Sequence, residues 1–203
     1  MPDQRENAPV DTRERILSAA STELARRGFA GARMEAIGRL AGVRKQVIYY
    51  YFPSKAALAQ AVLDRSNAQS SDFWASFEES STSAVLHEAI RRLTTSKEQL
   101  AHLIWEGQEY SNDDGLHIPI SAERRADLRR IARLIEREQA AGDLDVTLDP
   151  QYLALLLVLM SVAPPAFPQL TQMLTGSSWD DPVFVTRWSD LTGRLLASLR
   201  VEN

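Results

Sequence analysis

The stretch Ile37–Lys55, IGRLAGVRKQVIYYYFPSK, decides the fold of this chain. Its first part continues a pattern that begins at Met34, with apolar residues at helical spacing instead of strand alternation. Ala41-Gly42 then predicts the end of a helix, because glycine tolerates the left-handed backbone that a helix stop often needs. A second helix is predicted from Lys45 to Tyr51. Two short helices around a glycine-containing turn indicate a helix-turn-helix.

The second helix is expected to bury one face and to present the other to a nucleic acid. Val47, Ile48 and Phe52 are its apolar anchors, and Tyr51 is expected to pack back on them. On the other face, cations suit phosphates, and glutamine or tyrosine can contact a base edge or the backbone. Together with one arginine before the first helix and one lysine after Pro53-Ser54, the candidate DNA-binding residues are Arg33, Arg44, Lys45, Gln46, Tyr49, Tyr50 and Lys55.

Individual roles can be assigned within this set. Lys45 is expected to bind a phosphate or a guanine, and Gln46 is the best candidate for reading a base, since its amide both donates and accepts. Lys55 follows the predicted cap Ser54 at a helix start, where free N–H groups attract anions, so it is a candidate phosphate clamp.

The run from Thr12 to about Leu63 resembles the DNA-binding domain of TetR-type transcriptional regulators. The matching features are Ile16, Ala20, Gly28-Phe29, Ile37, Ala41-Gly42-Val43, Tyr49, Phe52, Ser54-Lys55 and Leu58. The resemblance implies a bacterial regulator with a three-helix DNA-binding head and a helical body that holds a small-molecule effector and forms a dimer.

The chain departs from the family pattern at three positions. Ala32-Arg33 stands where the family usually has Thr or Ser as a helix cap, so a cap contribution of about 1 kcal/mol is expected to be missing. Arg44 replaces the usual Ser, and Gln46 replaces a frequent Gly. Both changes lengthen the side chains of the second helix, and we expect them to contribute to sequence specificity.

The chain has 203 residues, of which 44% are hydrophobic and none is cysteine. This composition is typical of a globular protein. Met1–Val10 is polar and lacks the apolar core of a signal peptide, and the longest apolar run, Tyr152–Met160, is too short to span a membrane. A cytoplasmic protein without disulfides is therefore expected. The net charge of −4 is unevenly distributed, at +4 up to Lys55 and −8 beyond it, which suits a protein that offers one end to DNA.

No strand signal appears, so an all-α fold is predicted. Residues 1–10 are expected to be a disordered tail, 11–56 the DNA-binding domain and 57–203 the ligand-binding and dimerisation domain. Asp11 and Glu14 predict a capping box for the first helix. The remaining predicted helices span residues 55–77, 84–93, 96–110, 121–141, 150–163, 168–174 and 182–200.

The helix from about 150 to 163, begun by Asp149-Pro150 and ended by Pro164-Pro165, is apolar almost all round. The last helix, about 182–200, has a wide apolar stripe. Such helices must be covered on more than one side. Pairing with a second copy covers them, so we expect a homodimer through these two helices; the alternative is that both simply line the core of one chain.

Candidate effector-binding residues lie mainly in the segment 96–110. His102, Trp105 and Glu106 share one helical face, with Tyr110 beyond them and Met160 as a weaker candidate; His117 is weaker still, and His87 is expected to be solvated or in the core. Such a face is also typical of an ordinary core beside a surface edge. The identity of the effector is unknown.

The predicted function is a ligand-responsive repressor that binds a palindromic operator in double-stranded DNA as a dimer. Three scattered histidines, no glycine-rich phosphate loop and no cysteine argue against an enzyme, a metal site or a cofactor. One alternative is a helical partner-binding module with a degenerate DNA-binding head, which the changes at Ala32 and Arg44 keep open. Another is a regulator that activates transcription instead of repressing it.

Overall fold

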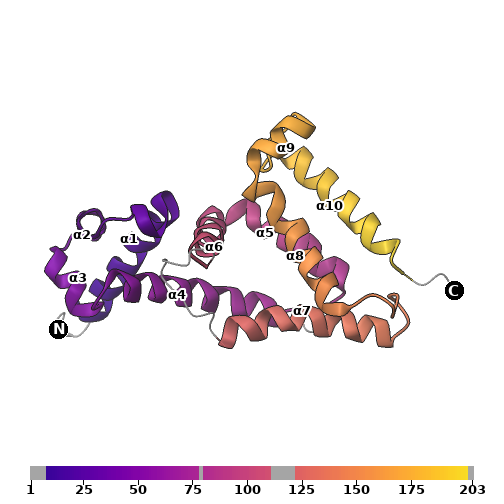
Figure 1. Cartoon of the computed structure of the whole chain (residues 1–203), viewed down its shortest axis with the longest axis horizontal. Coiled ribbons are helices and arrows are strands. Elements are labelled where there is room, and N and C mark those ends of the chain that lie inside the picture. The colour runs from indigo at the N-terminus through magenta and orange to yellow at the C-terminus, as the bar shows by residue number, and fades with distance from the viewer. Residues whose placement is uncertain (1–7, 78–79, 111–121, 201–203) are drawn as a thin grey trace, which may run out of the picture. The chain divides into compact units, whose positions relative to one another are not determined.

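The computed structural model describes residues 8–77, 80–110 and 122–200. Residues 1–7 of the expected tail, His117 and Ser121, the first residue of the predicted helix 121–141, lie outside these ranges. Every regular element within them is an α-helix, which confirms the predicted fold class (Figure 1). The helices are α1 (Ala8–Gly31), α2 (Met34–Ala41), α3 (Lys45–Tyr51), α4 (Lys55–Ala75), α5 (Thr82–Thr95), α6 (Lys97–Tyr110), α7 (Ala122–Ala140), α8 (Pro150–Ala166), α9 (Pro168–Thr175) and α10 (Pro182–Ala197).

The chain groups into two compact units. The head unit comprises residues 1–68 and 101–119, and the body unit comprises residues 69–100 and 120–203. The boundary falls inside α4 and inside α6, so each of these helices contributes to both units. The head unit is therefore larger than the segment 11–56 in which the sequence places the DNA-binding domain.

The core of the head unit is formed by α1, α2, α3, α4 and one side chain of α6. Ile16 and Leu24 from α1, Ile37 from α2 and Ile48 from α3 are buried in one cluster. Trp105, which lies far along the chain in α6, belongs to the same cluster. The helix-turn-helix is thus held by a core to which a later helix contributes.

The start of α1 differs from the prediction. The helix begins at Ala8, so Asp11 lies inside it and is not its cap. Pro9 is compatible with this start, because the first turn of a helix has no use for the N–H that proline lacks. Gly28 breaks the helix, since its φ of 66° is left-handed, and a further helical turn follows to Gly31.

Two Asp-Pro pairs start helices α8 and α10 of the body unit, the first of them as predicted. The Asp149 carboxylate accepts hydrogen bonds from the N–H groups of Gln151 (2.8 Å) and Tyr152 (3.3 Å). Asp181 does the same for Val183 (2.7 Å) and Phe184 (3.4 Å). The last helix ends at Ala197, three residues before the predicted end.

The predicted end of α8 at Pro164-Pro165 is wrong, because the helix continues through both prolines to Ala166. Proline at position 164 leaves the carbonyl of Met160 without its helical donor. The indole N–H of Trp188 in α10 donates to that carbonyl at 2.8 Å. The Thr171 hydroxyl in α9 donates to the carbonyl of Pro164 at 3.1 Å. Neighbouring helices thus satisfy the groups that would otherwise end α8.

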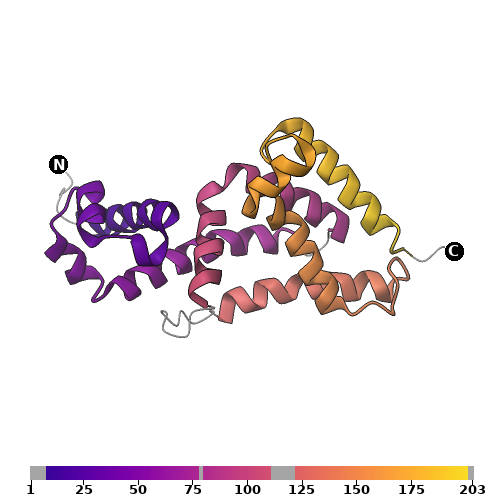
Figure 2. The same cartoon turned by 45° about the horizontal axis from the view of Figure 1, so that its top comes forward.

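The core of the body unit joins α5, α7, α8 and α10 (Figure 2). Its buried side chains are Leu86, Ile90, Ile131, Ile135, Leu144, Leu153, Ala154, Leu157 and Leu196. Within the described residues no single helix is long and apolar enough to cross a membrane; only α8 and α9 taken together reach that threshold, and they are bent by 83° at their junction.

Candidate nucleic-acid interface

The corner between α2 and α3 is fixed by backbone hydrogen bonds. Gly42 has a left-handed φ of 68°, and its N–H donates to the carbonyl of Arg39 at 3.3 Å. The N–H of Val43 donates to the carbonyl of Gly38 at 2.9 Å. The guanidinium of Arg15 in α1 donates to the carbonyl of Ala41. These contacts confirm the predicted helix stop and tie the turn to α1.

Gly38 is a second glycine on which the corner depends, and it was not among the residues predicted to shape the turn. A Cβ atom at this position would lie 2.8 Å from the carbonyl oxygen of Val43, which is backbone and cannot easily move aside. The close approach of α2 to the start of α3 therefore requires a residue without a side chain. The signal in the sequence was a glycine on the buried side of a short helix.

We expect Gly38→Ala to lower the free energy of unfolding by about 1–3 kcal/mol, the usual range for overpacking. Because the strain falls on the turn before α3, DNA affinity should fall by at least about tenfold as well. Gly107→Ala is the matched control, since a Cβ there meets no atom within 4 Å and alanine favours a helix. Urea denaturation and DNA titration of both variants measure the effects; equal behaviour of the two would contradict the steric argument.

The second helix of the helix-turn-helix, α3, has the predicted bounds and the predicted two faces. Ile48 and Phe52 are buried, while Val47 and Tyr51 are partly buried against the same core. Tyr50 is 84% exposed. Six of the seven candidate DNA-binding residues lie on the surface of the head unit: Arg33, Arg44, Lys45, Gln46, Tyr49 and Tyr50. Their contact with DNA stays a prediction.

The start of α2 lacks a side-chain cap of its own, as the replacement by Arg33 predicts. Glu23 of α1 instead supplies a hydrogen-bond acceptor at the start of α2. Its side chain is almost fully buried, and its Oε1 accepts a hydrogen bond from the N–H of Arg33 at 3.4 Å. The same carboxylate pairs with Arg27 at 3.4 Å. A carboxylate at a helix start is favourable, because the free N–H groups there carry partial positive charge.

Lys45, the first residue of α3, forms an ion pair with Glu35 of α2. Its Nζ lies 2.6 Å from Glu35 Oε1 and 5.8 Å from the centroid of the Tyr49 ring. The hydrogen bond to Lys45 lowers the pKa of the Glu35 carboxyl, and the same bond raises the pKa of Lys45. Both groups are therefore charged at neutral pH. Glu35 is another residue of this surface that was not among the predicted candidates.

Lys55 is the least exposed of the seven candidates. Its Nζ donates to the carbonyl of Ala30 at 3.3 Å and lies 4.7 Å from the centroid of the Phe29 ring. Burial lowers the pKa of Lys55, and Glu109 opposes that shift. Ser54 caps α4 as predicted, since its hydroxyl accepts from the N–H of Ala57 at 3.0 Å. Lys55 thus already satisfies the end of α1, and its role as a phosphate clamp stays a prediction.

The candidate effector-binding residues are divided between the two units. His102 and Trp105 are buried in the head unit, where His102 Nε2 lies 3.2 Å from the Ser21 carbonyl and Trp105 stacks on Phe29 at 6.4 Å. Glu106 is partly exposed, and Tyr110 is exposed. Met160 packs against the core of the body unit. The shared face of His102 and Trp105 is thus part of a core, and ligand contact by any of the five stays a prediction.

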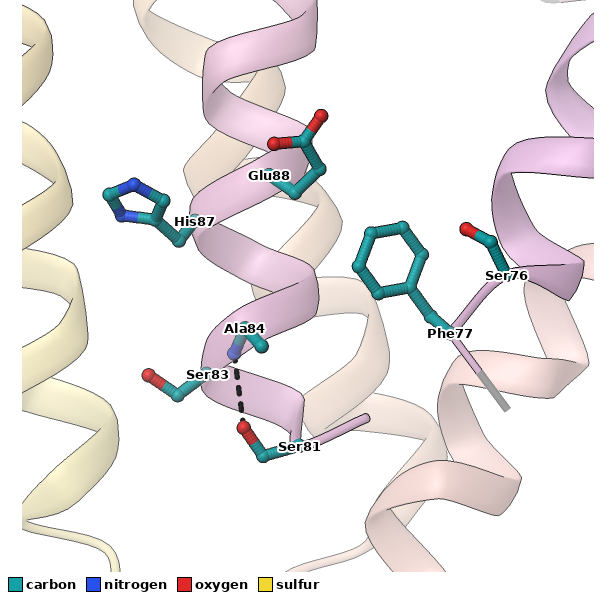
Figure 3. Close-up of a pocket in the computed structure, with 7 residues that line it drawn as sticks. All are labelled: Ser76, Phe77, Ser81, Ser83, Ala84, His87 and Glu88. Atoms are coloured by element: carbon teal, nitrogen blue, oxygen red, sulfur yellow. Dashed lines mark hydrogen bonds between the residues drawn. The ribbon is translucent and has the colours of Figure 1, made fainter. Parts of the chain in front are cut away.

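The body unit contains an open depression of about 620 Å³ beside α5. It is lined by Ser76, Phe77, Ser81, Ser83, Ala84, His87 and Glu88. Figure 3 shows the His87 and Ser83 side chains on one side of α5 and the Glu88 carboxylate on the other, so the polar groups do not converge on one point. Ligand sites usually combine an apolar wall with a few convergent polar groups, and this depression lacks that arrangement.

A second, smaller hollow of about 20 Å³ lies in the same unit, between α5, α7 and α8. Apolar side chains such as Val85, Ile131 and Val158 form most of its wall. The Thr82 hydroxyl also lines it, is 1% exposed and has no hydrogen-bond partner among the described residues.

Within the residues that the structure describes, no group of three or more His, Asp or Glu side chains is placed to hold a metal ion.

Comparisons with known proteins agree with this geometry. The family described as "Bacterial regulatory proteins, tetR family" matches residues 16–62, which contain the helix-turn-helix. The HTH-type transcriptional repressor SCO4008 of Streptomyces coelicolor is 29% identical over 168 residues, covering 83% of this chain and 85% of that protein.

Solved structures share the fold at lower identity. The putative transcriptional regulator SCO4942 of Streptomyces coelicolor has a TM-score of 0.73 at 21% identity, covering 95% of this chain and 99% of that one. The structure of AibR in complex with isovaleryl coenzyme A and operator DNA has a TM-score of 0.69 at 14% identity, covering 91% and 97%.

Proposed function

Since the chain belongs to the TetR family of bacterial regulatory proteins, we propose that it is a repressor that binds a palindromic operator as a homodimer and is released by a small molecule. It is a DNA-binding transcriptional regulator and not an enzyme. The observation that carries the proposal is the outer face of α3, where Arg44, Lys45 and Gln46 are exposed beside Tyr49 and Tyr50. Cations and an amide on a short exposed helix suit the major groove.

The proposed dimer interface is the exposed apolar face of α8 and α10. On α8, Tyr152, Leu155 and Leu159 are exposed at helical spacing. On α10, Leu191 and Leu195 are exposed one turn apart. Water-exposed leucines repeated along two helices of one unit favour burial against an identical face. Two recognition helices in one particle would then read the two halves of a palindrome.

The proposed effector site lies in the body unit. Support comes from the structure of AibR, which shares the fold and was solved in complex with isovaleryl coenzyme A and operator DNA, and from Met160, which packs against the core of that unit. The chain enters the body unit through α4 and again passes between the units through α6. We propose these two helices as the link to the head unit. An effector releases DNA only if it binds the DNA-incompetent arrangement more tightly.

Lys45→Ala tests the DNA-binding proposal. We expect the variant to bind operator at least about tenfold more weakly, because one charge-assisted contact of the recognition helix is lost. Lys97→Ala is the matched control: Lys97 is an exposed lysine of the body unit, paired with Asp180 at 2.7 Å, and its loss should leave DNA affinity unchanged. Fluorescence anisotropy at fixed salt measures both. Unchanged binding by Lys45→Ala would favour the alternative of a partner-binding module.

A further inference from the structure

A carboxylate lies on the surface of the head unit that carries the recognition helix. Glu35, the second residue of α2, pairs with Lys45, the first residue of α3, and both side chains are well exposed. The other charged side chains close to it along α2 and the turn, Arg33, Arg39 and Arg44, are cations. A negative charge in such a set repels the phosphates that the cations attract.

A contribution to folding stability does not explain the presence of the Glu35–Lys45 ion pair. Exposed ion pairs contribute little to folding, because water and salt screen the attraction and two flexible side chains must be held together. Neither residue belongs to the core of the head unit. The consequence of the pair is electrostatic: in the free protein, Glu35 neutralises the cation that begins the recognition helix.

The pair offers DNA a donor next to an acceptor. A phosphate presents only hydrogen-bond acceptors. It can accept a hydrogen bond from the Lys45 ammonium, but its negative charge repels the Glu35 carboxylate. In the major groove, a G·C pair presents the guanine acceptors N7 and O6 beside the N4 amino group of cytosine. An ammonium can donate to guanine while a neighbouring carboxylate accepts from cytosine. The pair is therefore complementary to a G·C edge and not to the backbone.

We propose that Glu35 is a specificity-determining residue of the DNA interface. On arbitrary DNA it restrains Lys45 and opposes phosphate binding, which weakens non-specific association. At the operator it accepts from a cytosine amino group while Lys45 donates to the paired guanine. A contact that is favourable with one partner and repulsive with the others raises the difference between their affinities. The inference rests on the DNA-binding function and needs no effector.

The test compares Glu35→Gln with Glu14→Gln. Glu14 is an exposed glutamate of α1 in the same unit, paired with Arg65 at 3.4 Å, so its variant loses the same charge away from α3. Dissociation constants are measured by fluorescence anisotropy over a series of salt concentrations. The two ligands are the operator obtained by selection from random duplex DNA and a scrambled duplex of the same composition. Glu35→Gln should bind the scrambled duplex more tightly, with a salt slope steeper by about 1.

The decisive quantity is the ratio of the two dissociation constants. Glu35→Gln should lower this ratio by about tenfold, as expected for the loss of one base contact. Glu14→Gln should change both constants by the same factor. In a Lys45→Ala background, Glu35→Gln should have little further effect on the scrambled duplex, because the restrained cation is gone.

Selection of random duplexes supplies the second readout. Sites selected by Glu35→Gln should lose a G·C preference at one position of each half-site that the unaltered protein retains. An unchanged ratio of dissociation constants, or unchanged base preferences, would overturn this inference while leaving the proposed function intact. If the unaltered protein enriched no site at all, the proposed function would fall, and this inference with it.

Discussion

Replacing Trp105 with alanine is expected to lower the free energy of unfolding by about 3–5 kcal/mol and to abolish measurable operator binding. Trp105 is 3% exposed and belongs to the core that holds the helix-turn-helix. Its ring stacks on Phe29, with centroids 6.4 Å apart, and its Cβ would lie 3.8 Å from a Cβ at Gly28. Its removal leaves a large cavity beside the end of α1, which the rigid surroundings fill only in part.

The control for Trp105→Ala is Tyr110→Ala. Tyr110 ends the same helix and is 68% exposed, so its truncation should change the free energy of unfolding by less than about 0.5 kcal/mol. Urea denaturation followed by circular dichroism, with operator titration alongside, measures both variants. A loss below about 1 kcal/mol for Trp105→Ala, with DNA binding retained, would show that α6 is not needed for the head unit.

Placing a glutamate on the exposed face of α8 and on that of α10 is expected to dissociate the proposed dimer. In Leu159→Glu/Leu195→Glu, both changes fall on side chains that are exposed in one chain, so each chain should still fold. In the dimer the two-fold axis would bring four carboxylates into an apolar interface, where unpaired charges are costly. Operator affinity should fall by about 10²–10⁴, because the second recognition helix no longer binds as part of the same particle.

Val146→Glu is the control for that variant, since it introduces the same charge at an exposed apolar position between α7 and α8. Light scattering after size-exclusion chromatography gives the mass of each species. A mass of one chain is expected for the double variant and a mass of two chains for the control. A double variant that remained dimeric and bound operator normally would place the interface elsewhere.

Elements with local signals were predictable from the sequence. The start at Asp149-Pro150 and the stop at Gly42 depend on residues within one turn of the helix end. The outer face of α3 was predictable for the same reason, because its periodicity separates Ile48 from its exposed neighbours. These predictions needed no knowledge of how distant parts of the chain meet.

Features that depend on distant contacts were not predictable. Periodicity shows that Trp105 and His102 share an inward face but not which helix covers it, and the covering helix proved to be α1. The continuation of α8 through Pro164 depends on Trp188 donating to Met160 from another helix. The burial of Glu23 and the clash that forbids a side chain at Gly38 likewise arise only when separate segments approach.

In vitro selection of random duplex DNA by the purified protein, near physiological salt, tests the central claim most directly. A dimer with two recognition helices should enrich a two-fold symmetric site whose half-sites are centred about 34–36 Å apart, or a multiple of that distance. The Lys45→Ala variant should enrich that site poorly. An enriched site without two-fold symmetry, or no enrichment over random sequence, would contradict the assignment of the chain as a dimeric, operator-binding repressor.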